Sequence, residues 1–393
     1  MLSVILYLAV FAASGFMASC TIQQKFNKKV IHNEGMQRQF LLSGREGGKW
    51  GIAKLLIKAL FCSLPVILLY GLRVGIGTDY TAYEGMYEVL HNADFFYYWE
   101  QHNEIAGAFY VEPGYYILNK LAPSYRVLLF ADILFIIIPL WLALFEFKQN
   151  ISLSFAIFIF MSIQFIYSMN GVRYIIAVSF ILLGFVYLIS DKNLRFFCCI
   201  LTASLFHTSA LICIAYYFIK NFKNNRLNAV RNMLFYAAVF MFAFGSKYII
   251  RLVSGIPVFY RYFSTEVYSF SDGMHHGVFW LLHIIPVIVP LLLVCGKSLL
   301  YDSRSGIMFR IYLTEIPFRM MGLYNTWFTR LVRIPQVIEV IFIPYVLKNI
   351  KNKNTRRIMI LYYAVWYVFY FVYYILVNDQ RSSIPYQWIF SRH

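Results

Sequence analysis

The stretch "LLIKALFCSLPVILLYGLRVGIGTDYTAYEGMYE", residues 55–88, decides how this chain folds. Its first half is an apolar run of roughly 20 residues, the length that a helix needs to cross the hydrocarbon core of a bilayer. Its second half changes abruptly, because residues 73–88 contain one arginine, three acids and three tyrosines. A membrane helix is therefore followed directly by a polar, aromatic segment outside the hydrocarbon core.

The rest of the chain repeats the apolar half of this pattern. Hydrophobic residues make up 60% and charged residues 13% of the 393 residues, against about half and about a quarter in soluble domains. Further apolar runs begin near Met1, Tyr125, Ile151, Val172, Phe196, Asn232, Val278, Arg310, Ile334 and Ile358. The sequence predicts an all-α, polytopic membrane protein of about 10–12 transmembrane helices, folded as one integral membrane domain over residues 1–393.

Basic loops orient the predicted helices. Residues 20–54, 220–231 and 347–357 are rich in Lys and Arg, and the positive-inside rule places all three in the cytoplasm. The same rule accounts for most of the net charge of +17 without a nucleic-acid partner. Alternate crossings agree with this topology only if residues 196–219 form a re-entrant hairpin with a break near Phe206–Ser209. The alternative is one continuous helix that departs from the rule.

The N-terminus and two loops fall on the outer side in this topology. The first apolar run, residues 1–19, lacks the basic flank and cleavage site of a signal peptide, so we expect a retained helix. The outer loops are residues 73–124, expected to contain short interfacial helices, and residues 251–277. Several arginines lie at or near this side: Arg73, Arg126, Arg173, Arg251, Arg261, Arg330, Arg333 and Arg381. Guanidinium groups bind phosphate oxygens in pairs and stay charged, which suits a pyrophosphate ligand. The alternative for each arginine is an ion pair with an acid of the first outer loop.

Four short motifs carry candidate site residues. "RVGIGTDY" places two glycines before Asp79, which is either a base or the cap of a turn. "VEPGYYILNKLAP" places Glu112 before a short apolar stretch. "MNGVRYIIAVSF" places Asn170 and Arg173 between two helices, where the arginine is either a ligand group or a snorkelling anchor. "LFHTSALI" places His207 inside an apolar run, where an ionisable group is functional by default, although a core histidine is the alternative.

Other catalytic motifs are missing from the sequence. There is no phosphate-binding loop, no HExxH, no paired CxxC and no GxSxG. A cytosolic ATPase, a zinc hydrolase and an α/β-hydrolase are therefore disfavoured. We expect no metal and no cofactor, and hence a substrate that arrives already activated.

The four motifs, in this order, resemble those of the EpsG-like branch of Wzy-type polysaccharide polymerases. The residues that carry the resemblance are Arg73, Gly75, Gly77, Thr78, Asp79, Tyr80, Tyr83, Glu112, Pro113, Gly114, Tyr115, Leu118, Asn119, Asn170, Arg173, Phe206, His207, Ser209, Ala210, Leu211 and Ile212. The likeness continues more weakly through Arg261 and Arg330. The chain departs from the family pattern at Tyr174, where a glutamine is usual, and at Arg333, which lacks the usual aromatic pair after it.

The resemblance implies a lipid-pyrophosphate-dependent glycosyltransferase with a GT-C-like architecture. Such an enzyme acts at the outer face of the bacterial cytoplasmic membrane. It transfers a growing glycan from undecaprenyl pyrophosphate to the nonreducing end of an incoming undecaprenyl-pyrophosphate-linked oligosaccharide repeat unit. The implied partners are this lipid-linked oligosaccharide, the lipid bilayer, a chain-length regulator and a flippase, with no nucleic acid.

This reaction gives the candidate residues their roles. Arginines stabilise the charge that grows on the leaving pyrophosphate, and a base takes the proton of the acceptor hydroxyl. The candidate bases are Asp79, then Glu112, then His207. The candidate pyrophosphate- or glycan-binding residues are Arg73, Tyr80, Tyr83, Tyr115, Asn170, Arg173, Arg261, Arg330 and Arg333.

Two other functions compete with polymerisation. A lipid-linked oligosaccharide flippase or transporter is disfavoured, because such proteins usually have repeat symmetry around a midplane site, whereas here charged groups gather at one face. An O-antigen ligase uses the same donor, so the sequence separates it poorly from a polymerase.

Overall fold

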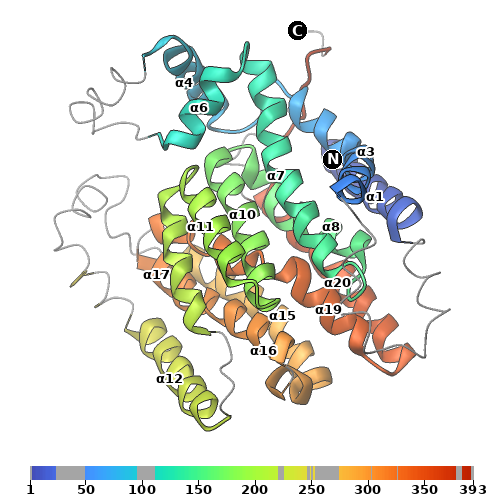
Figure 1. Ribbon diagram of the computed structural model, residues 1–393, viewed down its shortest axis with the longest axis vertical. Coiled ribbons are helices and arrows are strands. Elements are labelled where there is room, and N and C mark those ends of the chain that lie inside the picture. Colours follow the sequence, from blue (N-terminus) through green and yellow to red (C-terminus); the bar gives the residue numbers. More distant parts are fainter. Residues whose placement is uncertain are drawn as a thin grey trace. The chain divides into compact units, whose positions relative to one another are not determined.

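The computed structural model describes residues 2–23, 49–94, 111–219, 225–245, 248, 251–252, 274–301, 303–324, 326–377 and 383–390. All regular secondary structure among these residues is helical, and no strand occurs among them (Figure 1). Within the described part of the chain, four helices are long and apolar enough to cross a membrane, at Leu2–Ile22, Gly51–Gly71, Tyr125–Phe147 and Val172–Ile189, and several shorter apolar helices accompany them. The prediction of an all-α, polytopic membrane protein is thus confirmed.

The described residues form two compact units. The first unit comprises Met1–Val186, Leu194–Leu211 and Tyr367–His393, and the second comprises Tyr187–Asn193 and Ile212–Trp366. The chain passes between the units at four positions, each within a helix: α10 (Val172–Ile189), α11 (Asn193–Ser204), η3 (Thr208–Ile219) and α20 (Lys353–Val377).

The first unit is built on four helices that pack in pairs, α1 with α3, α3 with α7, and α1 with α8. Its elements are α1 (Leu2–Ala18), η1 (Ser19–Gln23), α3 (Lys49–Gly71), α4 (Tyr80–Asn92), α6 (Pro113–Leu121), α7 (Tyr125–Phe147), α8 (Leu153–Phe160), η2 (Met161–Phe165), α9 (Ile166–Ser168), α10 (Val172–Ile189) and α11 (Asn193–Ser204). Gly15 lets α1 approach α8 closely, since a Cβ atom there would lie 3.2 Å from the Ser154 carbonyl oxygen. Trp141 of α7 donates to Ser63 Oγ of α3 at 2.8 Å, which satisfies its buried indole N–H.

The segment expected to contain a break does contain one. Helix α11 ends at Ser204 and the 3₁₀-helix η3 (Thr208–Ile219) begins four residues later. Twelve residues span about 18 Å as an α-helix and about 24 Å as a 3₁₀-helix, so neither element alone crosses a hydrocarbon core of about 30 Å. The interruption at residues 205–207 is therefore confirmed, whereas the re-entrant path stays a prediction.

The C-terminal segment returns to the beginning of the first outer loop. Val74 donates its N–H to Gln387 and Ile389 donates to Leu72, each at 3.1 Å, so residues 387–389 lie beside residues 72–74. The Tyr386 hydroxyl donates to the Leu69 carbonyl at 2.6 Å, and its backbone N–H donates to Ser3 Oγ at 2.9 Å. The N-terminal end of α1, the start of the first loop and the tail thus lie together, and the side of the membrane on which they lie stays a prediction.

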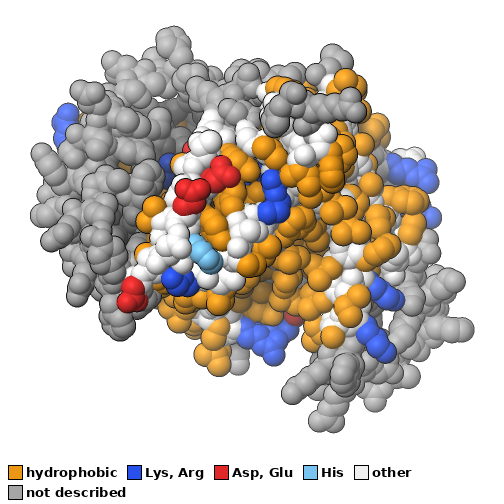
Figure 2. Space-filling model, turned by 90° about the horizontal axis from the view of Figure 1, so that it is seen from above, with side chains coloured by type: hydrophobic (Ala, Val, Ile, Leu, Met, Phe, Trp, Pro, Cys, Tyr) orange, Lys and Arg blue, Asp and Glu red, His pale blue; other side chains and the backbone are white. Residues whose placement is uncertain are grey.

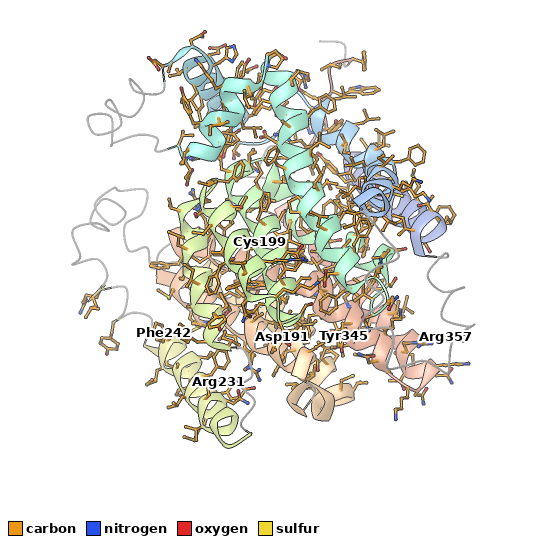
Figure 3. All side chains as sticks on the ribbon, viewed as in Figure 1. Asp191, Cys199, Arg231, Phe242, Tyr345 and Arg357 are labelled. Carbon is orange, nitrogen blue, oxygen red and sulfur yellow. The ribbon has the colours of Figure 1, made fainter. Side chains whose placement is uncertain are left out.

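The second unit has a buried helix at its centre. Its helices are α12 (Asn225–Phe244), α15 (Met274–Tyr301), α16 (Ser303–Leu313), α17 (Glu315–Tyr324), η5 (Thr326–Thr329), α18 (Arg333–Gln336), α19 (Glu339–Asn349) and α20 (Lys353–Val377). Every residue of α19 from Glu339 to Leu347, including Tyr345, is buried. The side chains in Figure 3 fill the space between the ribbons. Tyr363 of α20 donates to the Val287 carbonyl of α15 at 2.7 Å.

Candidate functional site

The glycine motif of the first outer loop is held against the turn that precedes α10. Gly77 has φ +107°, and a Cβ atom there would lie only 2.6 Å from the Met169 carbonyl oxygen. A residue with a side chain is therefore excluded on both conformational and steric grounds. Next to it, Thr78 Oγ1 donates to Asn170 Oδ1 at 2.9 Å. The first and third motifs are thereby joined.

The second motif docks on the helix break of the fourth. Pro113 starts α6, where its missing N–H costs nothing. Gly114 donates its N–H to the Leu205 carbonyl at 2.8 Å, and a Cβ atom on Gly114 would lie 2.7 Å from that same oxygen. Glycine is therefore required for α6 to reach the end of α11.

Glu112 connects three of the motifs. Arg173 Nη1 donates to Glu112 Oε2 at 2.6 Å, and the Thr208 N–H donates to Glu112 Oε1 at 3.3 Å. The side chains of Glu112 and Arg173 are 4% and 18% exposed, so this is a largely buried ion pair. Burial raises the pKa of the Glu112 carboxyl above its ordinary value, and the Arg173 charge opposes that rise. A group that binds Arg173 would therefore change the proton affinity of Glu112.

Arg73 is buried beside Tyr70. Its guanidinium carbon lies 3.7 Å from the centre of the Tyr70 ring, a cation–π contact. The residue is 1% exposed, and its Nε and Nη1 atoms have no hydrogen-bond partner within the described part of the chain. Burial lowers the pKa of Arg73, but the neighbouring Tyr70, Tyr125 and Asp132 outweigh it and leave the pKa raised, so the group stays charged. Two of its three nitrogen atoms are therefore buried without a partner among the described residues.

Asp132 is a further candidate site residue, which the sequence did not single out. It lies in α7, is 1% exposed, and its Oδ1 atom has no hydrogen-bond partner among the described residues. It interacts electrostatically with Arg73 and with the hydroxyls of Tyr70, Tyr83 and Tyr115. The signal that could have found it is an acid inside the apolar run "VLLFADILFIII", because charged groups at that depth are costly and functional by default.

Tyrosine side chains lie near Arg73, Asp132 and Arg173. The rings of Tyr83 and Tyr115 meet edge-on with centroids 5.9 Å apart, and those of Tyr80 and Tyr125 are 5.3 Å apart. The Tyr115 hydroxyl is buried and has no hydrogen-bond partner in the described ranges. Burial raises the pKa of Tyr83 and of Tyr115, so both remain neutral hydroxyls that can donate or accept.

The other two candidate bases, Asp79 and His207, lie in the same unit as Glu112 but in different surroundings. Asp79 is exposed at the start of α4, and Thr78 Oγ1 donates to its Oδ1 at 3.3 Å. His207 is half-buried in the helix break, with its Nδ1 2.7 Å from Ser209 Oγ and its ring edge-on to Tyr174 at 4.9 Å. Of the three, only Glu112 makes a direct ion pair with a candidate arginine in the structure as described.

Exposed charges mark the face of the first unit that carries α4 and α6. Asp79, Glu88 and Lys120 are exposed there. Figure 2 shows acidic, basic and histidine side chains intermingled on this face, beside a wide area of hydrophobic side chains. Polar groups next to an apolar surface are typical of a membrane–water interface.

Three predicted binding residues do not belong to this cluster as described. Arg261 lies outside the described residues. Arg330 is exposed in the second unit. Arg333 is buried there and donates from Nη1 to Gln336 Oε1 at 2.9 Å. Their place in the same site stays a prediction.

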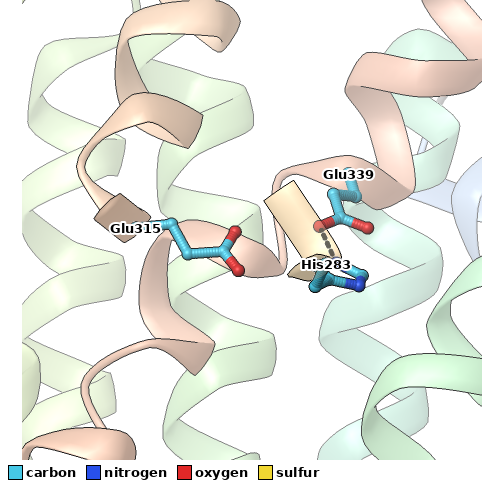
Figure 4. Close-up of side chains that lie close together, drawn as sticks. All are labelled: His283, Glu315 and Glu339. Carbon is cyan, nitrogen blue, oxygen red and sulfur yellow. Dashed lines mark hydrogen bonds and ion pairs between the residues drawn. The ribbon is translucent and has the colours of Figure 1, made fainter. Parts of the chain in front are cut away.

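The second unit contains its own buried ionisable cluster, His283, Glu315 and Glu339, drawn in Figure 4. Sequence reading missed it too. His283 and Glu339 each interrupt an apolar run, in "VFWLLHIIPVIVP" and "PQVIEVIFIP", so the same signal was present.

These features define a class: an all-helical, multi-pass membrane protein whose first unit gathers arginines, carboxylates and tyrosines where loops meet helix ends. The sequence profile of the EpsG family matches residues 56–388. The chain therefore belongs to the EpsG family, which confirms the resemblance and points to a role of the polysaccharide-polymerase kind. Neither a curated protein nor a solved structure matches the chain.

Proposed function

We propose that this protein is a polysaccharide polymerase that joins lipid-linked oligosaccharide repeat units. The growing glycan leaves undecaprenyl pyrophosphate and is transferred to the nonreducing end of an incoming lipid-linked unit, at the outer face of the bacterial cytoplasmic membrane. The observation that carries the proposal is the convergence of Arg73 and Arg173 with Glu112 and three tyrosines in the first unit.

Arg73 and Arg173 suit the leaving group. When the glycosidic C–O bond breaks, its electron pair departs with the pyrophosphate oxygen, and negative charge grows there. Preorganised guanidinium groups in a site of low dielectric stabilise such charge more than water does. Arg73 supports this role because two of its buried donor atoms are unpaired within the described residues.

Glu112 is the base that the geometry favours over Asp79 and His207. In the structure its carboxylate is bound by Arg173. A phosphate oxygen that takes up Arg173 would release Glu112 to accept the proton of the acceptor hydroxyl, whose oxygen then attacks the anomeric carbon. Donor binding and base activation would thus be coupled through one guanidinium group.

Asp132 and the tyrosines complete the proposed site. Asp132 interacts electrostatically with the buried Arg73, so its carboxyl group belongs to the proposed site. The hydroxyls of Tyr83 and Tyr115, with Tyr80 beside them, suit sugar hydroxyls, because a phenol both donates and accepts hydrogen bonds. The lipid portion of the substrate would remain in the bilayer beside the apolar helices.

A host that lacks this protein, complemented with variants, tests the proposal through the lengths of its surface glycan on a gel. We expect wild type and Arg357→Ala, which changes an exposed arginine of α20 (Figure 3), to give long chains. Arg73→Ala and Arg173→Ala should give single repeat units, since loss of one such donor costs about 100- to 1,000-fold in rate. Asp132→Asn should shorten the chains, and wild-type lengths would remove Asp132 from the site.

Membrane insertion of each variant, measured by immunoblot of the membrane fraction, controls for loss of the protein. Wild-type chain lengths in both arginine variants would contradict the arginine mechanism. Absence of even a single capped unit in the deletion host would instead indicate a flippase or a ligase.

A further inference from the structure

The buried cluster in the second unit brings together three side chains from three helices. His283 comes from α15, Glu315 begins α17 and Glu339 begins α19. One ligand atom from each lies within 4.8 Å of those from the other two, and their side chains are 0–1% exposed. Figure 4 shows them pointing toward one another from separate helices. Two carboxylates and an imidazole are costly to bury unless something compensates them.

Part of that compensation is visible. Arg319 donates from Nε to Glu315 Oε1 at 2.6 Å and from Nη2 to the same oxygen. The other oxygen, Oε2, is buried and has no hydrogen-bond partner in the described parts of the chain. One acceptor of Glu315 is therefore left for a further group.

The Nε2 atom of His283 lies between an amide nitrogen and a carboxylate oxygen. Arg333 donates to Gln336 Oε1 at 2.9 Å, which turns the Gln336 amide nitrogen toward His283 Nε2 at 3.2 Å. An amide nitrogen only donates, so a hydrogen bond from Gln336 selects the tautomer in which Nε2 carries its lone pair, whereas in the other tautomer Nε2–H donates to Glu339. Glu339 Oε1 lies 2.9 Å from the same ring nitrogen. A lone pair and a carboxylate oxygen at this distance need a proton or a metal ion between them.

We propose that His283, Glu315 and Glu339 form a binding site for one divalent cation. A cation ligated by His283 Nε2, Glu339 Oε1 and Glu315 Oε2 would resolve the contact between the first two atoms and occupy the free acceptor of the third. Ligands bound at about 2.1 Å and at the right angles of an octahedral site lie about 3 Å apart, close to the 2.9 Å between Nε2 and Oε1. One imidazole with two carboxylates suits Mn²⁺ or Zn²⁺ better than Mg²⁺, which prefers oxygen alone.

Arg319 and Arg333 set the strength of the site. Their charges offset those of the two carboxylates, so the cluster can remain buried without a cation, and they repel one that enters. We therefore expect reversible binding and not a trapped structural ion. The site differs from the sequence-based expectation of no metal, which rested on the absence of HExxH and CxxC spacing.

Equilibrium dialysis of the detergent-purified full chain against Mn²⁺, with bound metal counted by electron paramagnetic resonance, tests the proposal. A tag without histidines is used. Wild type and Glu88→Gln, which changes an exposed acid of α4, should each bind about one Mn²⁺ per chain. In Glu315→Gln and Glu339→Gln, which keep side-chain volume, binding should weaken by roughly tenfold or more, about 1.4 kcal/mol each.

Electron spin-echo modulation of the wild-type protein gives a second readout that needs no variant to fold. Bound Mn²⁺ should show coupling to a ¹⁴N nucleus from His283. No bound Mn²⁺, no nitrogen coupling, or unchanged binding in both glutamine variants would overturn the site and leave a proton shared by His283 and Glu339. Because no glycan substrate is present, failure here is separate from failure of the proposed polymerase activity.

Discussion

The ion pair between Glu112 and Arg173 is the most informative contact at the scale of single residues. Arg173 holds the carboxylate at 2.6 Å, and in the proposed reaction the phosphate of a bound donor would compete with Glu112 for that guanidinium group. The Arg73 guanidinium, in contrast, stacks on Tyr70 and keeps two unpaired donor atoms within the described structure. In the proposed mechanism Arg73 therefore binds the diphosphate without giving up another anion, whereas Arg173 exchanges the Glu112 carboxylate for it.

The raised pKa of Glu112 gives a pH prediction. A base acts only when it is deprotonated, so polymerisation should fall on the acid side at a pH above the ordinary range of glutamate. The Arg173 charge lowers the pKa of Glu112 against the effect of burial. In Arg173→Ala the acid limb of the residual activity should therefore move to still higher pH. Single-turnover rates with a lipid-linked repeat unit, measured across pH, check this.

Arg173→Lys is the matched variant for that experiment. It retains a positive charge near Glu112, so its acid limb should stay closer to that of the wild type even if its rate is low. An acid limb that does not move in Arg173→Ala would exclude Glu112 as the base and return that role to Asp79 or His207.

At the scale of elements, two glycines decide how the helices meet. Gly77 seats the first outer loop on the turn before α10, and Gly114 seats α6 on the break between α11 and η3. The sequence alone indicated that these motifs belong to one family of proteins. It did not indicate that a Cβ atom at either position would collide with the backbone of another motif, because that depends on which helix ends face each other.

Gly114→Ala is expected to destabilise the protein or displace α6. The added Cβ atom would lie 2.7 Å from the carbonyl oxygen of Leu205. Because this oxygen belongs to the backbone, it cannot move away as the end of a flexible side chain could. Overpacking of this kind costs about 1–3 kcal/mol. Gly85→Ala is the matched control, because nothing lies within 4 Å of its Cβ position on α4, and alanine there should stabilise the helix by roughly 0.5–1 kcal/mol. Thermal unfolding in detergent compares the two, and equal melting temperatures would contradict the proposed contact.

At the scale of the whole molecule, the sequence predicted those features that depend on continuous apolar runs and on short motifs. Apolar runs gave the helices, and the break before His207 was expected from loop charges. Asp132, His283 and Glu339 were equally visible as ionisable residues in apolar runs. The sequence did not indicate which of these residues would lie together. Glu315 and Glu339 are separated along the chain by α17 and α18, and they approach His283 only because the helices pack against one another.

The sequence-based site draws its residues from both units. Arg73, Glu112, Asn170, Arg173 and His207 share the first unit, and their contacts explain why four separated motifs occur in one protein. Arg330 and Arg333 belong to the second unit.

Binding of undecaprenyl pyrophosphate to the purified full chain, measured by native mass spectrometry, tests the central claim most directly. The wild type and Arg357→Ala should bind the lipid equally. Arg73→Ala and Arg173→Ala should each bind it at least roughly tenfold more weakly, about 1.4 kcal/mol, because each loses charge-assisted hydrogen bonds to the diphosphate. Undecaprenol, which has no phosphate, should bind all four proteins alike. If both arginine variants retained wild-type affinity for the pyrophosphate lipid, the two guanidinium groups would not hold the leaving group.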